Sequence, residues 1–128
     1  MTVRAKLILV KKVPAGSPVG YGATAVTESA TKLGLVAMGY ADGIPRIAQS
    51  AGVTFLGEKA PIIGRISMDQ FVVDLGAAST AQSGDWVSIF GPGTQENYTA
   101  DDWANASGSV NYEIVTRIGP RVPRIYEL

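Results

Sequence analysis

The sequence contains no cysteine and no histidine among its 128 residues. The absence of cysteine excludes disulfides, thiol nucleophiles and thiolate metal sites. The absence of histidine removes the commonest general base and metal ligand, so a Ser-His-Asp triad within this chain is impossible and we predict no metal site. Any chemistry must therefore depend on Tyr, Lys, Arg, Asp or Glu, on a cofactor, or on groups supplied by another chain.

An excess of charge and a long hydrophobic run are also lacking. Eleven basic residues balance eleven acidic ones, which gives no electrostatic footprint for nucleic acid or an anionic membrane. The aliphatic stretch Leu7–Val10 is far too short to cross a bilayer, and no signal-peptide cleavage pattern follows the N-terminus. We expect no nucleic-acid partner, no membrane span and a cytoplasmic location.

What the sequence does contain is an ordinary globular composition, with 46% apolar and 17% charged residues. Fifteen glycines and seven prolines separate short apolar runs, a spacing typical of mostly β domains. We predict a mainly β, barrel-like domain of short strands with two short helices near the C-terminus. The expected strands are Val3–Val13, Ala23–Glu28, Leu33–Met38, Val53–Leu56, Ala60–Ile66, Phe71–Leu75 and Trp86–Phe90.

Three connections are predicted from turn residues. A reversal at Ser29–Lys32 is expected to pair Ala23–Glu28 with Leu33–Met38, and Gly57–Lys59 is expected to form a hairpin turn. Pro45–Ser50 is expected to form one helical turn, with proline at its start.

Helix signals lie near the C-terminus. Thr99 followed by Asp102 resembles a capping box and predicts a helix over Ala100–Ala106. Asn111–Arg117 is predicted as a second helix, which Gly119 and the proline after it then end.

Four loop segments concentrate glycine, tyrosine, aspartate and arginine. They are Gly20–Thr24, Gly39–Gly43, Gly64–Gln70 and Arg121–Arg124. Each has an ordinary structural interpretation: Asp42 fits a turn, and Arg65 with Asp69 fits a surface ion pair. The arginines of the last segment, together with Arg117, fit a solvated face.

Taken together and in this order, however, the segments resemble the C-terminal domain of alanine racemase, the pyridoxal-phosphate enzyme that interconverts L- and D-alanine. Gly20–Thr24, Gly39–Gly43 and Ser67–Gln70 carry the likeness, which runs from about Val13 to the C-terminus. The resemblance implies a β domain that follows an N-terminal α/β barrel in a head-to-tail homodimer. Each active site would lie between one subunit's barrel and the partner's β domain.

The resemblance also implies a catalytic role for Tyr21. Racemisation removes a proton from one face of a planar carbanion and returns one to the other face, so two bases must stand on opposite sides. Tyr21 corresponds to one of them, and a cofactor-bound lysine of the barrel is the other. A phenol ionises near pH 10, and lowering its pKa by two units requires about 2.7 kcal/mol of preferential phenolate stabilisation.

The remaining matched residues take supporting roles by the same resemblance. The backbone amide of Met68 corresponds to the group that receives the substrate carboxylate. Tyr40 and Asp69 correspond to residues that line the substrate pocket. Arg46 and Arg65 correspond to charged residues of the corridor through which the substrate enters.

The sequence differs in two features from a complete member of the family that it resembles. Pro120 stands where some members of the family have a tyrosine whose hydroxyl reaches the cofactor phosphate, and proline has neither a hydroxyl nor an amide hydrogen. No segment around any of the lysines resembles the cofactor-lysine motif. We therefore expect residues 1–128 to be a single C-terminal β domain without its barrel, with Met1 an introduced start. Pyridoxal phosphate is expected in the full-length enzyme and not on this chain alone, which should be inactive.

Two other functions remain open at this point. The chain could be a non-catalytic β-barrel interaction module, an interpretation supported by the regular spacing of glycine and proline and by the neutral charge. It could also be the related domain of the pyridoxal-phosphate amino acid decarboxylases, but those present a catalytic cysteine and this sequence has none. Convergence of Tyr21, Tyr40, Met68 and Asp69 on one exposed rim would favour the racemase over the module.

Overall fold

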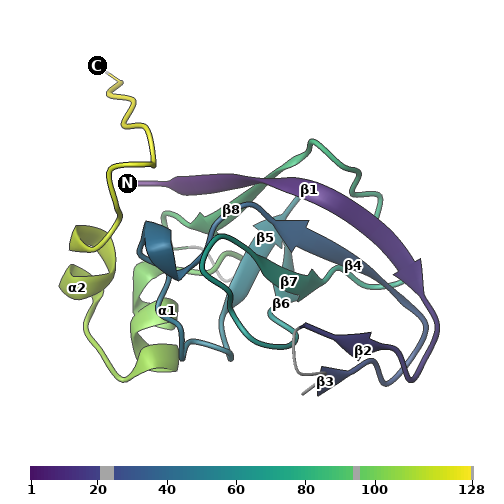
Figure 1. Cartoon of the computed structure of the whole chain (residues 1–128). Coiled ribbons are helices and arrows are strands. Elements are labelled where there is room, and N and C mark those ends of the chain that lie inside the picture. The colour runs from purple at the N-terminus through teal and green to yellow at the C-terminus, as the bar shows by residue number, and fades with distance from the viewer. Residues whose placement is uncertain (21–24, 94–95, 128) are drawn as a thin grey trace.

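The structure, a computed structural model, describes residues 1–20, 25–93 and 96–127. Within these ranges the chain is mainly β, with two short helices near the C-terminus, as the sequence predicts. The strands are β1 (Val3–Val13), β2 (Pro18–Val19), β3 (Ala25–Val26), β4 (Thr31–Val36), β5 (Gly52–Phe55), β6 (Glu58–Pro61), β7 (Phe71–Asp74) and β8 (Trp86–Phe90). The helices are the 3-10 turn η2 (Tyr40–Asp42), α1 (Ala100–Ser107) and α2 (Asn111–Thr116). Figure 1 shows α1 and α2 at one end of the sheet and the β2–β3 ribbon at the other.

The long strand β1 joins the two halves of the main sheet. Val3, Ala5 and Leu7 are buried and the residues between them are exposed, the alternation expected of a half-buried strand. Val3–Lys6 pairs with β8, and Leu7–Val13 pairs with β4, both antiparallel. The full order is β6-β5-β8-β1-β4-β7, so β1 lies in the interior of the sheet.

The two edges of this sheet meet and nearly close it. Just after β6, Ile62 forms an antiparallel bridge with Val73 of β7, and the Ile63 amide donates to the Val72 carbonyl at 2.9 Å. Closure removes exposed strand edges and encloses a single apolar core. The barrel-like fold predicted from the sequence is therefore confirmed.

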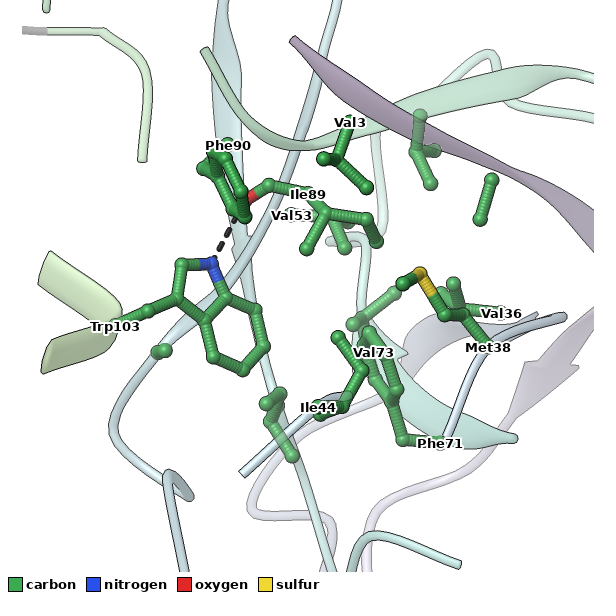
Figure 2. Packing of buried hydrophobic residues seen from close by; sticks show 14 of the residues in the cluster. Val3, Val36, Met38, Ile44, Val53, Phe71, Val73, Ile89, Phe90 and Trp103 are labelled. Atoms are coloured by element: carbon green, nitrogen blue, oxygen red, sulfur yellow. Dashed lines mark hydrogen bonds between the residues drawn. The ribbon is translucent and has the colours of Figure 1, made fainter. Parts of the chain in front are cut away.

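Trp103 of α1 closes one end of the core (Figure 2). Its side chain is fully buried, its ring meets Phe71 edge to face with centroids 6.2 Å apart, and its indole N–H donates to the Ile89 carbonyl at 2.7 Å. A buried indole N–H needs such a partner. This one residue therefore fastens α1 to β8.

Both predicted helices form. Thr99 and Asp102 make the reciprocal capping box, with the Thr99 hydroxyl accepting from the Asp102 amide and the Asp102 carboxylate accepting from the Thr99 amide. In α2, Ile114 is buried and Val115 is half-buried, so this helix turns its aliphatic residues to the core.

The local hairpin expected around Ser29–Lys32 is wrong. β3 pairs with β2, whereas β4 pairs with β1 and β7. β4 begins inside the expected reversal because the Thr31 hydroxyl donates to the Asp74 carboxylate at 2.6 Å, which ties this residue into the main sheet. Residues 21–24 of the expected strand lie outside the described residues.

Two turns also differ from expectation. The hairpin turn falls at Leu56–Gly57, one residue early, and both residues have left-handed φ values of 47° and 76°. A two-residue hairpin turn of type I′ requires a positive φ at both residues, a conformation that leucine rarely adopts. Pro45–Ser50 forms no helical turn. Successive turns instead bury Ala48 and Ala51.

Replacing Trp103 with phenylalanine is expected to lower the free energy of unfolding by about 2 kcal/mol, because the Ile89 carbonyl loses a buried donor and a cavity opens. Urea denaturation measures this change. Trp86→Phe is the matched control, because Trp86 is half-exposed beside Arg4 and Lys6, and it should cost less than about 1 kcal/mol. Equal losses for the two variants would contradict the assigned role of Trp103.

Candidate functional site

The loop after Ile66 forms a short turn that presents two of the predicted site residues. Ile66 and Phe71, on either side of the turn, are buried, and the Ser67 amide donates to the Gln70 carbonyl at 2.9 Å. Met68 and Asp69 therefore sit at the tip, and both are exposed. The apolar residues on either side anchor the turn, while its tip stays in solvent.

The turn packs against η2, which carries Tyr40. The Tyr40 amide donates to the Ser67 carbonyl at 3.0 Å, and the Ala41 amide donates to the Met68 carbonyl at 2.9 Å. A Cβ atom on Gly39 would lie 2.3 Å from the Ser67 carbonyl oxygen and 2.4 Å from that of Met68. Only glycine permits this approach of the two backbones.

Asp42 fixes η2 from inside. Its side chain is buried, and one carboxylate oxygen accepts from the Gly39 amide at 3.1 Å. The turn then ends at Gly43 with a left-handed φ of 108°, so the sequence-based interpretation of Asp42 as a turn residue is correct. It is also incomplete, because the other oxygen accepts from Arg121 Nε at 2.8 Å.

Arg121 bridges two carboxylates. While Nε donates to Asp42, Nη2 donates to Asp69 Oδ1 at 2.8 Å. The hydrogen bond to Asp42 and, to a smaller extent, the hydrogen bond to Asp69 raise the pKa of Arg121 above its usual value. The Asp69 carboxylate, which the sequence offered as a partner for Arg65, thus binds an arginine 52 positions further along the chain.

The C-terminal segment is fixed in place around Arg121. The Gly119 amide donates to the Asp42 carbonyl at 2.9 Å. The Arg124 guanidinium donates to the carbonyls of Ile118, Gly119 and Val122 at 2.6 to 2.7 Å. Arg121 and Arg124 are exposed, as the interpretation of a solvated face expects, but both guanidinium groups also bind other parts of the chain. We call residues 39–43, 67–70 and 118–121 the three-segment junction.

The Met68 amide is one of the free polar groups of this junction. Among the described residues it has no hydrogen-bond partner, although the Met68 carbonyl is bonded to Ala41. Beside it are the Asp69 carboxylate, held by Arg121, and η2 with Tyr40. An unpaired backbone N–H on a fixed, exposed turn is suited to donate a hydrogen bond to the carboxylate of a ligand.

Arg46 and Arg65 come together at a second place. Both line one shallow surface hollow, together with Ile47, Gln49 and Ile66. Arg65 lies one residue before Ile66, the buried residue that anchors the Met68 turn. The hollow therefore adjoins the segment that leads into the junction.

Tyr21, the predicted base, lies outside the described residues. Its described neighbour Gly20 has a left-handed φ of 76°, and a Cβ atom there would lie 3.5 Å from the Arg65 amide nitrogen. Tyr40 and Met68 are among the described residues and Tyr21 is not. The role of Tyr21 therefore stays a prediction.

The fold and the site together define a mainly β domain with a polar rim formed by the three-segment junction. Comparison with known proteins gives its family. The family model described as "Alanine racemase, C-terminal domain" matches residues 1–126. The chain belongs to the alanine racemase C-terminal domain family.

Relatives of similar sequence are complete alanine racemases. The chain is 50% identical to the enzyme of Beutenbergia cavernae and 54% identical to that of Streptomyces coelicolor, in each case over 98% of this chain. These matches cover 34% and 32% of the two relatives. The chain therefore spans about a third of the length of these relatives.

Solved structures agree. The crystal structure of alanine racemase from D-cycloserine producing Streptomyces lavendulae matches with a TM-score of 0.91 and 55% identity, over 98% of this chain and 33% of that one. The alanine racemase of Bartonella henselae, solved with covalently bound pyridoxal phosphate, matches with a TM-score of 0.88 and 36% identity, over 98% of this chain and 34% of that one.

The described side chains do not fit pyridoxal phosphate by themselves. Covalent attachment of this cofactor uses a lysine. Lys6 lies over the Trp86 ring, Lys59 lies over the Tyr98 ring, and Lys32 donates to the Ser79 carbonyl in the loop that follows β7. The two remaining lysines, at positions 11 and 12, lie in the second half of β1. None of these residues belongs to the three-segment junction.

In the described part of the chain, no helix is long and apolar enough to cross a membrane.

The close approach at Gly39 gives a prediction. Gly39→Ala is expected to lower the free energy of unfolding by about 1 to 3 kcal/mol, because the new Cβ would push apart the backbones of η2 and the Met68 turn. Gly93→Ala is the control, since among the described residues its Cβ would meet only Thr99, at an ordinary 3.7 Å, and it should stay within about 0.5 kcal/mol. Thermal unfolding of both variants measures the difference. A Gly39→Ala variant as stable as Gly93→Ala would show that the junction is not tightly packed.

Proposed function

We propose that this chain forms one wall of the substrate pocket of an alanine racemase, at a site completed by the α/β barrel of a partner subunit. The observation that carries the proposal is the free Met68 amide on a fixed turn, beside Tyr40 and Asp69. In this role the amide receives the substrate carboxylate, while the phenol and the carboxylate line the pocket around it. Arg46 and Arg65 steer alanine through the adjoining hollow.

The proposed base is Tyr21. It takes or returns the α-proton on the face of the substrate opposite the barrel lysine, as two-base racemisation requires. When bound, pyridoxal phosphate supplies the delocalisation that stabilises the carbanion. The cations that favour the phenolate must come largely from the opposing barrel, because this chain has no histidine to provide an imidazolium.

Three observations support a site shared with another polypeptide segment. The chain spans about a third of each complete racemase that it resembles. The three-segment junction contains no lysine, whereas the Bartonella relative holds its cofactor covalently. The residues at the tip of the Met68 turn face solvent, as a pocket wall does when its other half is on another domain. A head-to-tail homodimer is the arrangement we propose for bringing the halves together.

The runner-up, a non-catalytic β-barrel module, has less support. It requires no relation between the motif residues, which would then be scattered or buried. Tyr40, Met68 and Asp69 instead meet at one exposed rim, and the match to complete racemases extends over nearly the whole chain.

The role of Tyr21 is tested in the racemase that joins this chain to its barrel. Tyr21→Phe is expected to lower the turnover of L-alanine by about a hundredfold or more, because a general base is lost. Cofactor binding, followed by absorbance, should change little. Tyr112→Phe, at an exposed position on α2, is the matched control and should keep native rates. Unchanged rates for Tyr21→Phe in both directions would remove the general-base role.

The division of labour between the two domains gives a second test. The 128-residue chain, mixed with pyridoxal phosphate and L-alanine, is expected to form no D-alanine, because the lysine base and the other wall are missing. Chiral chromatography of the product detects racemisation. Turnover by the chain alone that exceeds the rate with cofactor alone would overturn the proposal of a shared site.

A further inference from the structure

We propose that Arg121 is a positioning residue of the substrate pocket, which keeps the Met68 amide available by holding the Asp69 carboxylate against a buried anchor. The inference rests on the proposed function. It adds a residue to which the resemblance assigned no role in the pocket and which sequence interpretation placed on a solvated face.

The anchor is Asp42. Both of its carboxylate oxygens are occupied, one by the Gly39 amide and one by Arg121 Nε. Its side chain is 9% exposed, against 55% for Arg121 and 61% for Asp69. A buried carboxylate held on both oxygens has little freedom to move, so it fixes the position of the guanidinium.

From that fixed position the guanidinium holds Asp69. Its planar fork offers parallel N–H groups, which lets one arginine bind two carboxylates at once. Asp69 is the residue next to Met68 and shares the tip of the same turn. A bound Asp69 side chain therefore limits the motion of the turn that presents the Met68 amide.

The charges at the junction give Arg121 a second effect. Asp42 and Asp69 carry two negative charges and Arg121 carries one positive charge. Without the guanidinium, an unpaired Asp69 carboxylate would lie beside the amide that receives another carboxylate. The Asp69 carboxylate and the substrate carboxylate would then repel each other. The loss of Arg121 should therefore weaken substrate binding more than it slows the chemical step.

The kinetic test uses the cofactor-loaded racemase that joins this chain to its barrel. Arg121→Gln is expected to raise the KM for alanine about tenfold in both directions, while kcat changes less. Arg121→Lys should fall between the native enzyme and Arg121→Gln, because an ammonium is a point charge that binds one carboxylate well. Arg117→Gln, an equal change at an exposed side chain outside the junction, should keep a native KM.

A second substitution distinguishes repulsion by the unpaired Asp69 carboxylate from the loss of packing around Arg121. Adding Asp69→Asn to Arg121→Gln is expected to recover at least threefold in KM, because it removes the unpaired carboxylate. A purely structural role predicts no recovery, since the double variant restores no contact. A KM for Arg121→Gln within twofold of Arg117→Gln, or a double variant no better than the single one, would overturn the inference.

A readout without activity keeps the two proposals distinguishable. In the 128-residue chain, Arg121→Gln should speed amide hydrogen exchange in peptides that cover residues 39–42 and 67–70, and leave α1 unchanged. Arg117→Gln should change neither region. If the native joined enzyme fails to racemise alanine, the proposed function is wrong, and the exchange data still decide whether Arg121 fixes the turn. Unchanged exchange in both peptides would contradict the positioning role.

Discussion

The ion pair between Arg121 and the buried Asp42 is the interaction on which the geometry of the rim depends. It connects positions 79 residues apart and brings the C-terminal segment against η2 and the Met68 turn. Removing Arg121 would leave the buried Asp42 carboxylate without its counter-charge and with one hydrogen-bond donor fewer. The pair therefore joins residues 39–43 to residues 118–121, and the hydrogen bond from Arg121 to Asp69 joins the third segment, residues 67–70, to the same guanidinium.

Local signals account for most of the fold. The capping box at Thr99 and the alternation in β1 need only neighbouring residues, so both were predictable from sequence. The strand pairing around Thr31 was not, because it depends on a hydrogen bond to Asp74, which lies 43 residues away. The hairpin turn at Leu56 also escaped prediction, since leucine with a positive φ contradicts ordinary turn preferences.

The site likewise contains residues that were predictable from the sequence and one that was not. Motif resemblance singled out Tyr40, Met68 and Asp69, and the structure brings these three together. Resemblance did not single out the link that holds them, because Arg121 reaches its two carboxylates only through tertiary contacts. The available signal was weak: Asp42 and Arg121 are opposite charges, each in a glycine- or proline-rich loop, and charge alone does not specify a partner.

Central to the proposed function is the Met68 amide, which we propose stays free to bind the carboxylate of alanine. A crystal structure of the assembled racemase with bound alanine tests it most directly. We predict a carboxylate oxygen about 2.7 to 3.2 Å from the Met68 nitrogen, with Arg121 still bridging Asp42 and Asp69. A substrate carboxylate bound elsewhere, with the Met68 amide bonded to protein, would contradict the claim.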